Sequence, residues 1–221
     1  MLRTVQFLFL ALAFTSSAAY AQRTYEVSIT NITRGQTFTP QLVLSHDRGT
    51  APFTAGQPAS VGLEELAEGG STAALTNEVA TVTRDSMTID GLLGPGETIS
   101  TEIIARPQQD VLSVAAMLIP TNDTFMALDS VELPRNRVPA VYYAPAYDAG
   151  TEANDQECAN IPGPRCGGEG FNPDRPVDQE GYVYIGNGFH SLDGAAEVEV
   201  LGPAVYDWRN PVARITVTRV R

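Results

Sequence analysis

The chain has 221 residues, and its 26 acidic and 14 basic side chains give a formal net charge of −12. Hydrophobic residues make up 43% of it and charged residues 18%, so the chain can bury a core and is not a disordered polyanion. All the basic residues are arginines and they form no cluster, which argues against a nucleic-acid partner because phosphate binding needs clustered basic side chains. The same acidity disfavours docking to an anionic membrane, unless a bound cation bridges the charges.

Residues 1–21 have the three-part pattern of a secretory signal peptide. Arg3 provides a short basic start, residues 5–14 are apolar, and residues 19–21 form an A-x-A cleavage site. The apolar run is shorter than a membrane-spanning helix, and a buried helix is the alternative interpretation. We therefore expect an exported protein of the extracellular or periplasmic space. Its mature domain would be residues 22–221, without a transmembrane segment.

Strand and turn patterns dominate this mature region. Alternating residues 25–30 predict the first strand, and helical spacing predicts two short helices, at residues 61–67 and from a cap at Ser71 to residue 80. Gly69-Gly70 is expected to end the first helix. Further strands are predicted at residues 42–44, 87–89, 98–105, 112–119, 131–133, 141–143, 181–186, 196–201 and 213–220. Many short strands separated by turns indicate one all-β domain, an antiparallel sandwich or barrel with one or two helices inserted early.

A long polar segment, residues 147–179, is rich in glycine and proline and is predicted to be a loop, which at this length is usually functional or flexible. It contains both cysteines of the chain, Cys158 and Cys166. In an exported protein an isolated close pair is most simply a disulfide that closes a small loop. A metal site is the alternative, although two cysteines without a nearby histidine are a poor set of zinc ligands.

Carboxylates in two turn-rich segments suggest a metal site. The first segment, residues 120–129, places Asp123 just after an apolar strand, at the expected rim of a sheet. The second, residues 147–155, places Asp148 and Glu152 on either side of a glycine that allows a tight bend. Calcium takes about six to eight oxygen ligands, often from loops. The alternative is an ordinary solvated acidic surface, and the spacing is not that of an EF-hand.

Two other function classes remain open. The sequence has no nucleophile elbow, zinc-protease motif, phosphate-binding loop or dinucleotide fingerprint. A hydrolase would have to use His46, for example paired with Asp47, or His190, and the alternative places these histidines at a strand end and in a turn. A lectin-like module that binds carbohydrate or matrix would use exposed aromatic side chains, with core packing as the alternative. The candidate platforms are Tyr142, Tyr143, Tyr182 and Trp208.

Several motifs together resemble the spondin amino-terminal domain family, which includes the spondin domains of F-spondin and mindin and short exported bacterial proteins. They are P-T-N-D-T-F-M-A-L-D-S (120–130), Y-D-A-G-T-E (147–152), D-W-R-N-P-V-A-R-I-T-V (207–217), N-I-T-R-G-Q (31–36) and L-S-H-D (44–47). The resemblance implies a non-enzymatic antiparallel β-sandwich similar to calcium-dependent lipid-binding domains. It also implies one calcium at the loop end, and a binding or adhesion role towards a cell-surface or matrix protein or a glycan.

Carried over by motif, the calcium ligands would be Asp123, Asp148 and Glu152, completed by carbonyls and water, and the metal would pin the long loop to the sheet rim. The sequence departs from the animal motif in two places. Thr124 and Phe125 follow Asp123 where animal members have D-W-F, so an aromatic contact beside the metal is lost. Glu152 replaces an aspartate and is longer but equivalent as a ligand. The cysteine loop belongs to an insert that the animal domain does not match.

Overall fold

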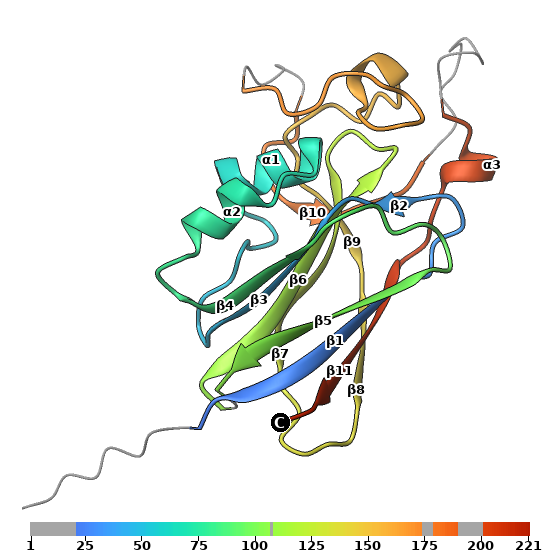
Figure 1. The fold of residues 1–221 in the computed structure, drawn as a ribbon. Helices are drawn as coiled ribbons and strands as arrows, with labels where there is room; N and C mark the ends of the chain where they lie inside the picture. The colour runs from blue at the N-terminus through green and yellow to red at the C-terminus, as the bar shows by residue number, and fades with distance from the viewer. Residues whose placement is uncertain (1–20, 107, 174–178, 190–200) are drawn as a thin grey trace, which may run out of the picture.

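The computed structural model describes residues 21–106, 108–173, 179–189 and 201–221, which form two antiparallel sheets with two helices against one of them (Figure 1). The smaller sheet has the order β5 (Thr98–Ala105), β1 (Arg23–Asn31), β11 (Ala213–Arg219), β8 (Ala140–Ala144). The larger has the order β10 (Tyr184–Ile185), β9 (Ala146–Asp148), β7 (Thr124–Glu132), β6 (Asp110–Ile119), β3 (Gln41–Asp47), β4 (Thr83–Ile89), with β2 (Thr37–Phe38) also paired to β6. The predicted all-β antiparallel sandwich is confirmed.

The smaller sheet follows the alternation of its sequence. Val27 and Ile29 of β1 are fully buried between the sheets, and the alternate residues Ser28 and Thr30 point outwards. The first and last strands are neighbours, with Val27 opposite Val217. Period-two patterning therefore decides which face of this sheet joins the core.

The middle of the larger sheet is buried on both faces. Every residue of β6 is buried, because one face packs against the smaller sheet and the other lies under the helices. Helices α1 (Val61–Gly69) and α2 (Ala73–Glu78) supply Leu63, Leu66 and Leu75 to this outer apolar layer. The continuous burial of β6 thus reflects a three-layer arrangement.

The helix ends follow capping chemistry, with one correction. Ser60 accepts a hydrogen bond from the Leu63 amide and caps α1, and Gly70, at φ 70°, ends it as predicted. Ser71 does not cap the second helix. Its amide donates to the Glu65 carbonyl and completes the end of α1, so α2 starts one residue later than that cap requires, after Thr72.

Other predicted boundaries also change. Residues 124–129 were expected to be turn-rich, but they belong to β7, because residues 125–128 are buried between the two apolar layers. Two helical turns were not predicted, η1 (Cys158–Asn160) and α3 (Pro203–Tyr206). The strand predicted at 181–186 is only the two-residue β10. The strand predicted at 196–201 lies outside the described residues, except for Leu201, which is not in a strand. The leader at 1–21 also lies outside them, except for Ala21. None of the helices in the described ranges is long and apolar enough to cross a membrane.

Candidate metal centre at the loop end of the sandwich

The sheet register brings Asp123 and Asp148 together. Asp123 lies in the turn between β6 and β7, and β9 pairs with β7 so that Asp148 is opposite Thr124. The amide of Ala149 also donates to the Asp123 carbonyl at 3.1 Å. The two carboxylates are 25 positions apart in the sequence, yet strand pairing makes them neighbours at one end of the larger sheet.

A bend at Gly150 folds the next residues back over Asp123. Gly150 has φ 67°, and a Cβ there would lie 2.3 Å from the Tyr182 carbonyl oxygen, so the predicted tight bend is confirmed and requires glycine. After the bend, the Thr151 amide donates to Asp123 Oδ2 at 2.7 Å and the Glu152 amide at 3.1 Å. The Thr151 hydroxyl lies 3.2 Å from the same oxygen.

Both aspartates are buried, and their charges are poorly compensated. Asp123 is 0% exposed, and its second oxygen, Oδ1, has no hydrogen-bond partner among the described residues. Burial raises the pKa of Asp123 to about 6, although the hydrogen bonds from Thr151 and Glu152 oppose the change. Burial, and next the negative charge of Asp123, raise the pKa of Asp148 to about 8. Asp148 receives hydrogen bonds from the Gly150 amide and Asn154 Nδ2, each at 2.9 Å.

The Glu152 carboxylate lies in a second acidic environment. Burial, followed by the charge of Glu68, raises the pKa of Glu152 to about 9. The backbone amide of Glu152 is the group that contacts Asp123. Glu68, on α1, is 1% exposed. It was not predicted as part of the site, because in the sequence it has the pattern of an ordinary residue of an amphipathic helix. With the side chains as they stand, the described residues contain no group of three or more Asp, Glu, His or Cys placed to hold a metal, so Glu152 as a ligand stays a prediction.

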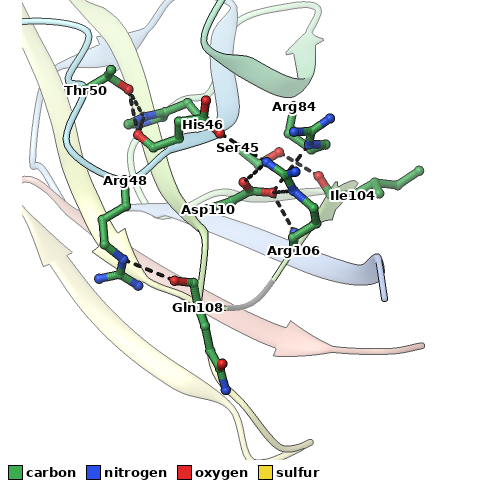
Figure 2. Close-up of polar contacts among 10 residues, drawn as sticks. Ser45, His46, Arg48, Thr50, Arg84, Ile104, Arg106, Gln108 and Asp110 are labelled. Carbon is green, nitrogen blue, oxygen red and sulfur yellow. Dashed lines mark hydrogen bonds and ion pairs between the residues drawn. The ribbon is translucent and has the colours of Figure 1, made fainter. Parts of the chain in front are cut away.

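A buried aspartate at the opposite end of β6 has the partners that Asp123 lacks (Figure 2). Asp110 is 0% exposed, and it accepts hydrogen bonds from Arg106 Nη2 at 3.0 Å and from the Arg106 amide at 2.6 Å. Arg84 Nε lies 3.7 Å from its Oδ2. In the described part of the chain, no arginine forms an ion pair with Asp123, Asp148 or Glu152. Arginine thus compensates the buried carboxylate of Asp110 at one end of the sheet, and the carboxyl groups at the other end have no arginine beside them among the described residues.

The His46–Asp47 pair that a hydrolase would need is not formed, and both residues lie at the end of β3, as the strand-end interpretation predicts. His46 Nδ1 lies 3.3 Å from the Asp47 carbonyl, whereas the Asp47 carboxylate pairs with Arg106. His46 Nε2 lies 2.8 Å from Ser113 Oγ, a contact that joins two strands and has no signal in the sequence. His46 and Ser113 are 2% and 3% exposed, so a substrate has no access to them. Burial also lowers the pKa of His46. His190 lies outside the described residues.

The four candidate aromatic platforms separate into two groups. Trp208 is 7% exposed and packs in the core, and the half-buried Tyr142 donates its hydroxyl to the Glu132 carbonyl, so neither is an exposed platform. Tyr143 and Tyr182 are 58% and 47% exposed. The core-packing alternative therefore holds for Trp208 and Tyr142 and not for Tyr143 and Tyr182.

The predicted disulfide between Cys158 and Cys166 is present, and the alternative of a cysteine metal site is excluded. The loop that it closes is joined to the acidic site through Asp155. Asp155 accepts hydrogen bonds from Asn122 Nδ2 at 3.1 Å, through Oδ1, and from Asn160 Nδ2, inside the disulfide loop, through Oδ2. The disulfide loop is thereby tied to the residue that precedes Asp123.

The family model of the spondin N-terminal domain (Spondin_N) matches residues 14–157, which is more than half of the chain. No curated protein matches the sequence. The matched residues include the turn that carries Asp123, the Gly150 bend and the strands from β1 to β9. The chain therefore belongs to the spondin N-terminal domain family, which suggests an extracellular-type binding module and is not known as enzymatic.

Proposed function

We propose that this protein is an exported, non-enzymatic binding module that holds one calcium ion through the carboxylates of Asp123, Asp148 and Glu152. The observation that carries the proposal is the buried Oδ1 of Asp123, which has no partner among the described residues. A buried carboxylate without a partner is costly, and the adjacent Asp148 adds a second negative charge. A divalent cation supplies the charge that arginine supplies at Asp110.

The chemistry of the available donors favours calcium. Carboxylates, the Thr151 hydroxyl and loop carbonyls are hard oxygen donors, which suit calcium and magnesium better than zinc. Calcium accepts irregular loop geometry, whereas magnesium demands a near-ideal octahedron and keeps several of its waters. Since Asp123 and Glu152 come from different segments, the ion would hold the segment after β9 against the β6–β7 turn. Its first role would therefore be structural.

The export and partner proposals rest on separate features. The leader pattern at residues 1–21, the disulfide and the family all favour an extracellular or periplasmic location. The absence of lysine and of clustered arginine in the sequence disfavours nucleic acid. A cell-surface or matrix protein or a glycan is the class of partner that the family favours.

Isothermal titration calorimetry of the purified protein with calcium chloride tests the metal site. We expect one-site binding with a dissociation constant of about 10⁻⁴–10⁻³ M, the range of extracellular modules. Asp123→Asn keeps the side-chain shape and should weaken binding at least about tenfold, since it removes one charge from the coordination shell. Asp90→Asn, at an exposed position between β4 and β5, is the matched control. The site assignment fails if the wild type shows no binding heat at about 10 mM calcium, or if Asp123→Asn binds as tightly as the control.

A further inference from the structure

A pocket of about 190 Å³ lies beside Asp148, where segments far apart in the sequence meet at the ends of β9 and β10. Its principal lining residues are Asp148, Asn154, Glu180, Tyr184, Asn187 and Trp208. Its volume is below the roughly 300–1,000 Å³ of sites for drug-sized ligands, so it suits a single ring.

Hydrogen bonds hold one wall of this pocket in place. Asn154 Nδ2 donates to Asp148 Oδ2 at 2.9 Å and to the Tyr184 hydroxyl at 3.0 Å. The Tyr184 hydroxyl donates to Glu180 Oε1 at 3.2 Å. This wall therefore presents carboxylate oxygens of Asp148 and Glu180 that are already oriented, and a ligand need not order them on binding.

Trp208 contributes a different feature to the same pocket. Its ring packs edge-on against Phe189, with the ring centroids 5.6 Å apart. Its indole N–H is buried and has no acceptor among the described residues. The pocket thus has a wall rich in acceptors and two aromatic side chains, Trp208 and Tyr184, among its lining residues, and the N–H of Trp208 lacks an acceptor among the described residues.

We propose that this pocket binds one ring of a neutral saccharide. Hydroxyl groups both donate and accept, so they match the carboxylate wall and the indole N–H together, and the half-buried Tyr184 ring adds apolar surface to the lining. The Glu180 carboxylate repels an anionic ligand. An ammonium ligand, methylated or not, has no acceptor and would leave the Trp208 N–H without a partner. This saccharide site rests on the proposed calcium function only through Asp148, which the two sites share.

Tryptophan fluorescence reads this pocket directly, because Trp208 is the single tryptophan of the chain. The purified protein is titrated with glucose, galactose, mannose and N-acetylglucosamine to about 50 mM each, once with EDTA and once with calcium, and tetramethylammonium serves as the cationic probe. We expect a saturable change with at least one saccharide. Glu180→Gln and Asn187→Ala should weaken it about fivefold, as expected for one lost hydrogen bond. Glu102→Gln and Asn77→Ala, at exposed positions of β5 and α2, should not.

Three results overturn the saccharide site: no saturable change with any of the four sugars, equal weakening in the pocket and control variants, or a saturable response to tetramethylammonium alone. Saccharide binding in either buffer supports it, and binding only with calcium adds that the metal completes the site. Calorimetry with calcium separates the two proposals. A saccharide response in a protein that binds no calcium refutes the metal centre alone, and calcium binding without a saccharide response refutes the pocket alone.

Discussion

Replacing Asp148 with asparagine removes one buried negative charge and keeps the size of the side chain. The pKa of Asp148 is raised from 3.8 to about 8, chiefly by burial. Each tenfold change in proton affinity corresponds to about 1.4 kcal/mol, so the difference costs the folded state roughly 5 kcal/mol at pH 8. The hydrogen bond from Asn154 must rearrange in the variant, and this loss reduces the gain in stability by about 1 kcal/mol. We expect Asp148→Asn to raise the unfolding free energy of the calcium-free protein by about 2–4 kcal/mol at pH 8.

The sign of this effect depends on pH. Because the folded pKa lies above the unfolded one, the folded state binds more protons between pH 4 and 8, and the wild type loses stability as pH rises through that window. The variant lacks this loss, so its advantage should vanish near pH 4. Urea denaturation in EDTA at pH 4, 6 and 8 measures both curves. Calcium should narrow the difference at pH 8, since it stabilises only the protein that binds it.

Asp110→Asn is the matched control, because Asp110 is equally buried but paired with Arg106 and Arg84. That substitution leaves two partly exposed guanidinium groups with a weaker partner and should destabilise the protein by about 1–3 kcal/mol at pH 8. If Asp148→Asn destabilises the calcium-free protein equally at every pH, Asp148 carries no uncompensated charge and the reasoning about this site is refuted.

Three further outcomes follow from particular contacts. Gly150→Ala should lower the unfolding free energy by about 1–3 kcal/mol in urea titrations, because φ is 67° and the added Cβ would meet the Tyr182 carbonyl; an unchanged midpoint would contradict the tight bend. Replacing Cys158 and Cys166 together by serine should cost roughly 2–3 kcal/mol by thermal unfolding, and reductant should lower the wild type to the same value but leave the variant unchanged. Ser113→Ala should cost about 1–3 kcal/mol and leave the secondary structure seen by circular dichroism intact, since it removes the partner of a buried histidine; a neutral effect would contradict that contact.

The sequence patterns that predicted correctly are those set by local physics. Alternation over residues 25–30 fixes which face of β1 is apolar, and Gly70 and Gly150 adopt positive φ where only glycine is comfortable. Two cysteines close in sequence form a disulfide because a short loop brings them within reach. The acidic motifs indicated the family, since their spacing is itself the signal.

The errors come from information that local sequence does not contain. Residues 124–129 look turn-rich beside Asn122 and Asp123, yet they form a strand because both faces of β7 are covered by other layers. Adjacent residues His46 and Asp47 left a catalytic pair open as an alternative, and only the fold shows that Arg106, from elsewhere in the chain, takes the Asp47 carboxylate. Long-range partners override neighbours in both cases.

The sequence alone therefore determined the strand-rich class, the disulfide and the identity of the acidic motifs, since each depends on residue type and short spacing. Only the tertiary structure decided which charges stand uncompensated. Strand pairing places Asp123 beside Asp148 and puts Arg84 and Arg106 at the other end of β6. It also brings residues 148, 154, 180–187 and 208 around one pocket. Burial and charge pairing are properties of segments that meet only after folding, so the composition that made this chain acidic could not show where its acidity would matter.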